Sequence, residues 1–132
     1  MPRPRPEPGS AAEWLQFAQS DLALAKISLP DQVFYNALCF HAQQAAEKSI
    51  KALLVRFGIH PPKTHSIESL LAFLPKTLEI PPEVEWAAGL TDYAVTTRYP
   101  GDFEEVLESE WKDAVRMAEE VFIWAKRTIE SQ

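Results

Sequence analysis

The 132-residue chain is poor in the residue types from which many enzyme and metal sites are built. It has one cysteine, four glycines and three histidines. The single cysteine, Cys39, excludes an internal disulfide and a cysteine-rich metal site, and its neighbours Leu38 and Phe40 predict a small buried hydrophobic residue. The chain contains no glycine-rich phosphate loop and no GxSxG motif, which argues against a P-loop nucleotide hydrolase and a serine hydrolase.

The histidines His41, His60 and His65 do not form a metal-binding pattern. A protein metal site needs three or four converging ligands, and the chain has no HExxH, CxxC or HxH spacing. We therefore expect no bound metal and no cofactor. His60 lies in a loop that is rich in proline, and we expect it to be exposed.

Long apolar runs and a positive net charge are also missing. No apolar stretch approaches the roughly 18 residues of a membrane span, and no secretory signal is visible, so we expect a cytoplasmic protein without a membrane contact. The net charge of −6 excludes a protein that is basic over its whole surface. Attraction to the phosphates of a nucleotide or RNA would therefore have to come from a local patch.

The first ten residues, MPRPRPEPGS, differ from the rest of the chain. Proline alternates there with Arg, Glu or Gly, and no apolar residue follows Met1. Because proline lacks a backbone donor, we predict a disordered, proline-rich tail over residues 1–10. This tail is either a plain extension or a docking arm. Residues 11–129 are predicted to form a single helical domain, and the 46% hydrophobic content of the chain is sufficient for a core.

Helical periodicity predicts an all-α fold, an up-and-down antiparallel bundle of four to five helices. Asp31 is expected to cap the second helix, with Gly58 ending it. Asp102 is expected to cap the last helix, with Glu104, Glu105 and Glu108 in its first turns. The five predicted segments cover residues 11–29, 32–57, 66–74, 82–97 and 102–129.

The predicted second helix has a continuous polar stripe. At about 100° per residue, its apolar residues fall on one broad arc and its polar residues on the opposite side. The stripe is either an ordinary solvated face, with Glu47 and Lys51 as an i,i+4 pair, or it faces a cleft or a second subunit. Phe40 and Leu54 lie in the polar arc, which favours cover by a partner. The stripe consists of His41, Gln43, Gln44, Glu47, Lys48 and Lys51.

Two further places have chemical interest. His65, at the start of the third helix, can cap that helix or reach the second one. Arg98 and Tyr99 precede Pro100, which predicts a sharp break in the chain. Arg98 there can bind phosphate or carboxylate. Alternatively it can pair with Asp102 or cap the terminal carbonyls of the fourth helix. Tyr99 can contact a ligand or pack in the core.

The stretches NALCFHAQQAAEKSIKALLVRFG, PPKTHSIESLL and YAVTTRYPGDF, in this order, resemble the HEPN family, a small all-α domain named for nucleotide binding in higher eukaryotes and prokaryotes. The resemblance covers about residues 11–128. It implies a bundle that commonly dimerises and works with a minimal nucleotidyltransferase, in many cases as a toxin–antitoxin pair. Some family branches are metal-independent ribonucleases, in which an Arg is followed after four to six residues by a His.

The chain departs from this ribonuclease pattern, because Phe103, Glu104 and Glu105 occupy the positions where the histidine would fall after Arg98. We therefore expect a non-catalytic, homodimeric nucleotide-binding module with a nucleotidyltransferase partner. The alternatives are a ribonuclease toxin that uses Arg98 with His65 or Tyr99, and an interaction bundle without a ligand. The expected ligand-binding residues are His41, Gln43, Gln44, Lys48, Lys51, His65, Arg98 and Tyr99.

Overall fold

A computed structural model describes residues 4–94, 101 and 103–131. These residues form helices and connecting segments and contain no strand, which confirms the predicted all-α bundle. The elements are α1 (Ala11–Ala25), α2 (Tyr35–Arg56), α3 (Ile67–Ala72), α4 (Pro82–Trp86), the 3₁₀ helix η1 (Ala87–Ala94) and α5 (Glu108–Ser131).

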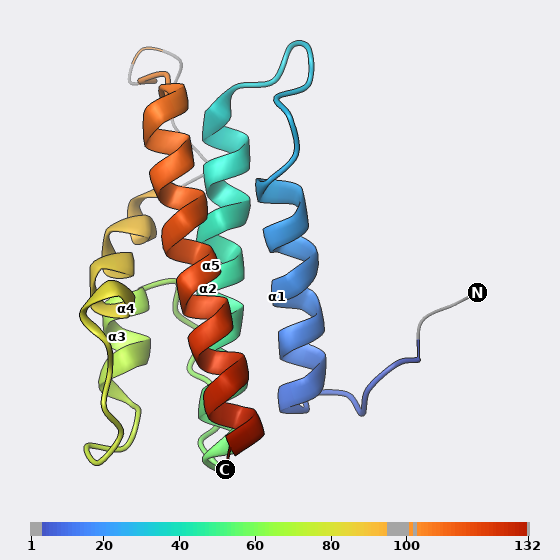
Figure 1. The fold of residues 1–132 in the computed structure, drawn as a ribbon, viewed down its shortest axis with the longest axis vertical. Coiled ribbons are helices and arrows are strands. Elements are labelled where there is room, and N and C mark those ends of the chain that lie inside the picture. The colour runs from blue at the N-terminus through green and yellow to red at the C-terminus, as the bar shows by residue number, and fades with distance from the viewer. Residues whose placement is uncertain (1–3, 95–100, 102, 132) are drawn as a thin grey trace.

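The three long helices α1, α2 and α5 lie side by side along the long axis of the molecule (Figure 1). The short helices α3, α4 and η1 lie on the side of α2 and α5 that is away from α1 (Figure 1). Helix α2 therefore has neighbours on several sides. This arrangement explains why thirteen of its residues are buried, including some of its charged ones.

Small side chains allow the helices to pack closely around α2. Ala42, Ala45, Ala46 and Ala52 are fully buried, as is Cys39, in agreement with its prediction as a buried hydrophobic residue. Burial raises the pKa of the Cys39 thiol to about 12, with a smaller contribution from Glu110. The larger core side chains come from all parts of the chain and include Leu22, Ile50, Leu53, Leu54, Ile67, Leu70, Val84, Leu90, Val121 and Phe122.

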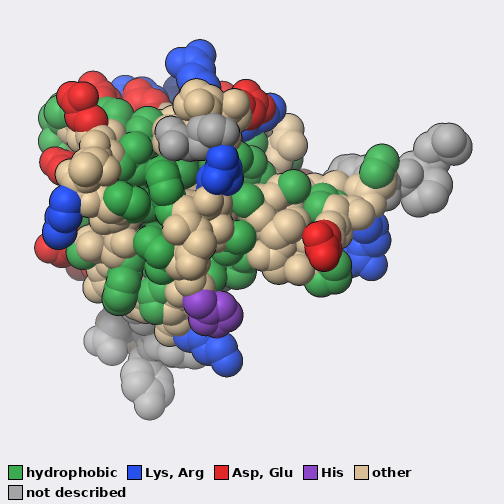
Figure 2. Space-filling model, turned by 90° about the horizontal axis from the view of Figure 1, so that it is seen from below, with side chains coloured by type: hydrophobic (Ala, Val, Ile, Leu, Met, Phe, Trp, Pro, Cys, Tyr) green, Lys and Arg blue, Asp and Glu red, His purple; other side chains and the backbone are tan. Residues whose placement is uncertain are grey.

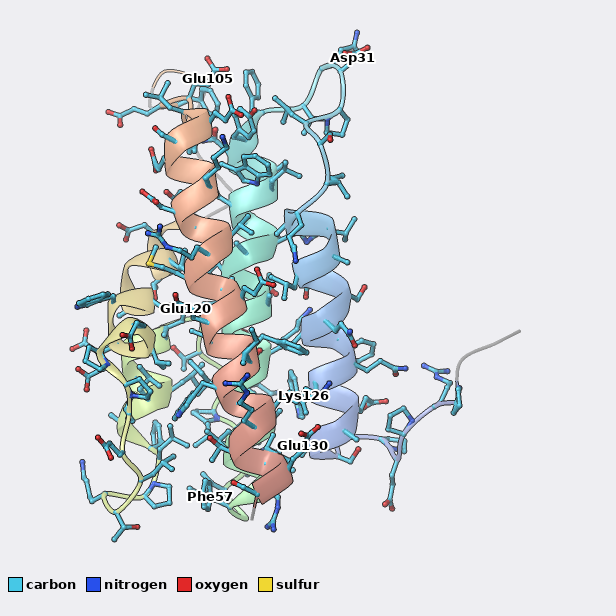
Figure 3. The ribbon with its side chains drawn as sticks, viewed as in Figure 1. Asp31, Phe57, Glu105, Glu120, Lys126 and Glu130 are labelled. Atoms are coloured by element: carbon cyan, nitrogen blue, oxygen red, sulfur yellow. The ribbon has the colours of Figure 1, made fainter. Side chains whose placement is uncertain are left out.

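Helix α2 begins later than the sequence predicts. Asp31 does not cap it, because the N-cap residue is Phe34 and no side chain supplies the capping hydrogen bond. Figure 3 places Asp31 at the outer tip of the loop between α1 and α2. The other end of α2 agrees with the prediction. Gly58 has φ +77°, and the Ile59 N–H donates to the Leu54 carbonyl over 2.9 Å in a glycine-type C-terminal turn.

The last two predicted helices also differ from the structure. The segment predicted as one helix from residue 82 is a single α-helical turn followed by the 3₁₀ helix η1. Helix α5 begins at Glu108, so Glu104 and Glu105 precede it rather than lie in its first turns. Asp102, the expected cap, lies outside the described residues.

The segment before α5 is held by a side chain of α2. The Asn36 amide donates to the Glu104 carbonyl over 2.9 Å and accepts from the Val106 N–H over 2.9 Å. Both backbone groups therefore have a partner outside a helix. This tertiary contact replaces the helical hydrogen bonds that the sequence pattern predicts.

Candidate functional site

Half of the predicted polar stripe lies inside the molecule. The exposed fractions of Gln43, Glu47 and Lys51 are 0%, 3% and 7%. The expectation of an ordinary solvated face is wrong for this half, since α1 and the segment before α3 cover it. Lys51 also borders a hollow at the end of α2. Leu54 is also fully buried within the chain, so it needs no partner subunit to cover it.

The carboxylate of Glu47 organises the buried half. Its Oε1 accepts from Gln43 Nε2 at 3.0 Å and lies 2.8 Å from His65 Nδ1, while its Oε2 lies 3.0 Å from Lys51 Nζ. The Gln43 amide also donates to the His65 carbonyl over 3.2 Å. These contacts join α2 to the segment that leads into α3. We call this group the Glu47 network: Gln43, Gln44, Glu47, Lys51 and His65.

The surroundings of Glu47 keep it ionised. Burial alone would raise the pKa of this carboxyl group, but hydrogen bonds from Gln43, His65 and Lys51 outweigh the cost of burial. The pKa of Glu47 is therefore lowered below its ordinary value. An ionised Glu47 is the acceptor that fixes the side chains around it, and it offsets the charge of Lys51.

Two further residues of the stripe, His41 and Lys48, form a second network with α1. Asp21 Oδ1 lies 2.9 Å from His41 Nδ1, and Asp21 Oδ2 lies 2.6 Å from Lys48 Nζ. The Lys48 ammonium group also lies 6.0 Å from the centroid of the Phe17 ring. His41 and Lys48 are thus engaged within the chain, and each predicted cation of α2 has a carboxylate partner.

His65 combines a buried orienting partner with an exposed ring. Its side chain is 69% exposed, while Glu47 is 4% exposed. Because a carboxylate only accepts hydrogen bonds when ionised, His65 Nδ1 is the donor, which leaves Nε2 as the nitrogen for a ligand or a proton. The prediction that His65 can reach the second helix is confirmed, and the cap of α3 is Ser66 instead.

A hollow of about 540 Å³ lies at the end of the bundle where α2 finishes and α1 begins. Figure 2 views the molecule from below, the side on which this end lies, and shows broad hydrophobic areas with few charged groups between them. The Lys51 ammonium group lies 5.6 Å from the centroid of the Trp14 ring within this hollow. We call it the tryptophan hollow, and its lining includes Trp14, Lys51, Ile59, His60, Pro61 and Lys63.

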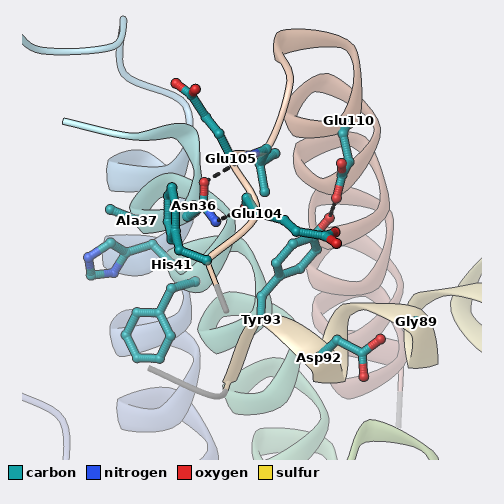
Figure 4. A pocket seen from close by; sticks show the side chains of 12 residues that line it. Asn36, Ala37, His41, Gly89, Asp92, Tyr93, Glu104, Glu105 and Glu110 are labelled. Carbon is teal, nitrogen blue, oxygen red and sulfur yellow. Dashed lines mark hydrogen bonds between the residues drawn. The ribbon is translucent and has the colours of Figure 1, made fainter. Parts of the chain in front are cut away.

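A second hollow of about 580 Å³ lies between α2, η1 and the segment before α5 (Figure 4). Its lining combines aromatic rings with carboxylates. The Tyr93 hydroxyl donates to Glu110, and burial together with this acceptor raises the pKa of Tyr93. We call it the acidic hollow, and its lining includes Phe40, Asp92, Tyr93, Phe103, Glu104, Glu105 and Glu110.

The structure brings the predicted residues of α2 into two networks rather than one cleft. Arg98 and Tyr99 lie outside the described residues. Trp14 and Asp21 were not predicted as site residues. The sequence feature that could have identified them is the carboxylate of Asp21, which falls within the apolar helical face that runs from Trp14 through Phe17 to Leu22. A charge at such a position needs a partner.

The model of the HEPN domain matches residues 11–128. The chain belongs to the HEPN family. Two solved structures are similar to this chain. The protein TT1696 from Thermus thermophilus is 31% identical, with a TM-score of 0.78, over 90% of this chain and 98% of that one. ST0689, described as an archaeal HEPN homologue, is 28% identical, with a TM-score of 0.71, over 91% and 98%. No curated protein sequence matches this HEPN chain.

The described part of this HEPN protein was searched for a membrane-spanning helix and for a metal site. None of its helices has the length and apolarity needed to cross a bilayer. No group of three or more His, Cys, Asp or Glu side chains with metal-binding geometry occurs among the described residues. The carboxylates of the two networks are instead paired with lysine, histidine and amide groups.

Proposed function

We propose that this HEPN protein is a non-catalytic nucleotide-binding module. In this proposal it acts in the cytoplasm as a homodimer with a minimal nucleotidyltransferase partner, with a toxin–antitoxin pair as one form of that partnership. The observation that carries the proposal is the tryptophan hollow. There Lys51 is held over the ring of Trp14, in a chain whose net charge is −6.

The tryptophan hollow has the chemistry that a nucleotide needs. Its volume of about 540 Å³ falls in the range of small-molecule pockets, roughly 300–1,000 Å³. Trp14 offers a ring on which a base can stack, an interaction of about 1–3 kcal/mol per base. Lys63 is exposed and forms no ion pair with another described residue, so its ammonium group is available to a phosphate. The acidic hollow would repel the same phosphate.

The test is nucleotide binding by full-length protein with Lys63 changed to Glu. Lys51 is the less informative residue to change, because its loss would also leave Glu47 without a cation. We expect ATP, GTP, CTP or UTP to raise the melting temperature of the wild type. Lys63→Glu should weaken the affinity measured by calorimetry about tenfold, the loss of one charge-assisted contact.

The matched control is Lys76→Glu, the same charge change at an exposed lysine that does not line the hollow. Equal losses in the two variants would argue against the tryptophan hollow as the site. Arg98→Ala tests whether that predicted residue belongs to the site. If no nucleotide shifts the melting temperature of the wild type, the interaction bundle becomes the better description.

A second candidate, a metal-independent ribonuclease, is favoured by one observation. The Glu47–His65 pair orients an exposed imidazole, which is the arrangement of a general base. Incubation with RNA in the presence of a chelator tests this. Cleavage by the wild type that falls by orders of magnitude in His65→Gln would establish the ribonuclease and contradict the non-catalytic module.

A further inference from the structure

The N-terminal segment has the chemistry of a docking arm. Residues 2–8, PRPRPEP, which we call the arm, alternate proline with Arg3, Arg5 and Glu7. This alternation favours the extended polyproline II conformation, in which the ordering cost of binding is low. Arg5 is exposed and forms no ion pair with another described residue. Figure 1 shows residues 4–10 running away from the bundle.

The acidic hollow has the complementary chemistry. Phe40, Tyr93 and Phe103 supply rings, and the Phe103 ring lies 4.8 Å from that of Phe34. The carboxylates of Asp92, Glu104 and Glu105 are exposed and form no ion pair with another described residue. Grooves lined by aromatic rings are the surfaces that recognise proline-rich segments, and carboxylates bind guanidinium groups in a bidentate manner.

We propose that the arm of one copy docks in the acidic hollow of a second copy. The prolines pack against Phe40, Tyr93 and Phe103, and the two guanidinium groups pair with the carboxylates at the rim. The rim is prepared for this, since Asn36 already fixes the backbone at Glu104 and Val106. The acidic hollow thereby receives apolar contacts from the prolines and ionic contacts from the arginines of the same short segment.

The geometry of α1 favours the hollow of another copy over that of the same copy. His41 lines the acidic hollow and meets α1 at Asp21, eleven residues beyond Ser10 or about 16 Å along the helix. Measured from Ser10, a fully extended arm reaches at most about 18 Å at Arg5 and about 25 Å at Arg3, but residues 4–10 run away from the bundle rather than along α1 (Figure 1). The turn at Pro8 and Gly9 shortens that reach, and the arm would also have to cross the width of α2, roughly 10 Å.

An exchange of arms would make a closed assembly. If each copy gives one arm and receives one, two copies satisfy each other through the same pair of surfaces, as in a two-fold dimer. The acidic hollow lies at the other end of α2 from the tryptophan hollow, and only Gly9, the residue that follows the arm, lines the latter. Nucleotide binding and arm docking can therefore fail independently. The arm exchange rests on the homodimer of the proposed function, so a protein that stays monomeric at all concentrations would contradict both.

The first experiment measures binding of a fluorescent peptide, MPRPRPEPGS, to full-length protein that carries Arg3→Glu and Arg5→Glu. In this acceptor the chain's own arm no longer competes. We expect saturable binding by anisotropy that weakens about tenfold or more when Glu104→Lys and Glu105→Lys are added, because like charges then face the peptide. The control adds Glu83→Lys and Glu85→Lys, two exposed residues of α4 outside the hollow, with the same change in net charge.

Equal affinity for the two lysine-bearing acceptors would overturn the proposal, because it would show attraction to net charge alone. Absence of any peptide binding would overturn it as well. Tight binding that is unaffected when Arg3 and Arg5 of the peptide are changed to Glu would show that the guanidinium groups are not recognised. The acidic hollow would then be assigned to a different partner.

The second experiment uses charge exchange between copies. Sedimentation velocity is measured for the arm variant with Arg3→Glu and Arg5→Glu, for the hollow variant with Glu104→Lys and Glu105→Lys, and for their mixture. We expect each variant alone to associate more weakly than the wild type, and the mixture to recover association because opposite charges face each other again. A mixture that is no more associated than its two components would contradict docking between copies. Association in the mixture that does not change when the protein is diluted would contradict it as well.

Discussion

At the scale of single residues, Glu47 makes the contacts that hold the polar side of α2 together. Its carboxylate is buried and receives three side-chain partners, which come from α2 and from the segment before α3. A buried charge of this kind is tolerated only while its partners remain. The same group therefore holds the tertiary contact between these elements and keeps Lys51 and His65 in place.

We expect Glu47→Ala to lower the free energy of unfolding by about 3 kcal/mol, because it leaves Lys51 buried without its carboxylate. Urea denaturation measures the change. Glu119→Ala is the control, since its ion pair with Lys26 at 3.1 Å lies at the surface, with side chains 40% and 47% exposed, and should contribute about 0–1 kcal/mol. A loss for Glu47→Ala no larger than that of the control would contradict the network.

The lowered pKa of Glu47 also predicts a pH dependence. Its stabilising contribution is fully present above the pKa of an unfolded glutamate, about 4.3, and is lost as the pH falls through the lower folded value. Glu47→Gln lacks this titration. The difference in unfolding free energy between wild type and Glu47→Gln should thus shrink between neutral and strongly acidic pH. A difference that stays constant with pH would show that the folded and unfolded states have the same pKa at Glu47, so that the network does not stabilise the carboxylate.

At the scale of elements, the segment before α5 depends on α2. The sequence pattern extends α5 back to residue 102, but the helix starts at Glu108, and Asn36 holds Glu104 and Val106 in a non-helical path. The acidic hollow exists because of this path, since several of its lining residues belong to the segment. One side chain of one helix thus shapes a surface that another part of the chain supplies.

We expect Asn36→Ala to cost about 1 kcal/mol of unfolding free energy and to speed hydrogen exchange at the Val106 amide, which loses its acceptor. Exchange measured by NMR gives the local effect. The control Gln19→Ala removes an exposed amide side chain of α1 and should change neither quantity. If Val106 exchanges at an unchanged rate in Asn36→Ala, the segment is held by other contacts.

At the scale of the whole molecule, α2 connects two chemically different ends. With 22 residues it is about 33 Å long. The acidic hollow lies beside its first turns, and the tryptophan hollow lies at its C-terminal end. The chain can therefore carry a net charge of −6 and still expose Lys63 beside the tryptophan hollow, because the carboxylates of the acidic hollow gather elsewhere.

The central position of α2 predicts the order of opening. Amides in its buried middle, around Ala45 to Leu53, should exchange only when the whole protein unfolds, whereas those of α4 should exchange through local opening. Exchange followed by mass spectrometry under mild denaturant compares the two. Equal protection of α4 and α2 would indicate a single cooperative unit without local opening.

The sequence alone determined the helical class, the three long helices and the family, because apolar periodicity and ordered motifs are properties of local sequence. It also located the turn at Gly58, where backbone conformation demands glycine. The burial of Gln43, Glu47 and Lys51 was decided only by tertiary structure. A helical wheel separates polar from apolar residues, but it does not show that α1 and the segment before α3 cover the polar side.

The same reason explains the missed boundaries. The extent of α5 depends on Asn36, which is about seventy residues away in sequence, and the partner of His41 and Lys48 is Asp21 on another helix. Such contacts form between side chains that only the packed bundle brings together. Local propensity therefore specifies which elements exist, while the hydrogen bonds and charges shared between elements specify where they end and which surfaces they leave open.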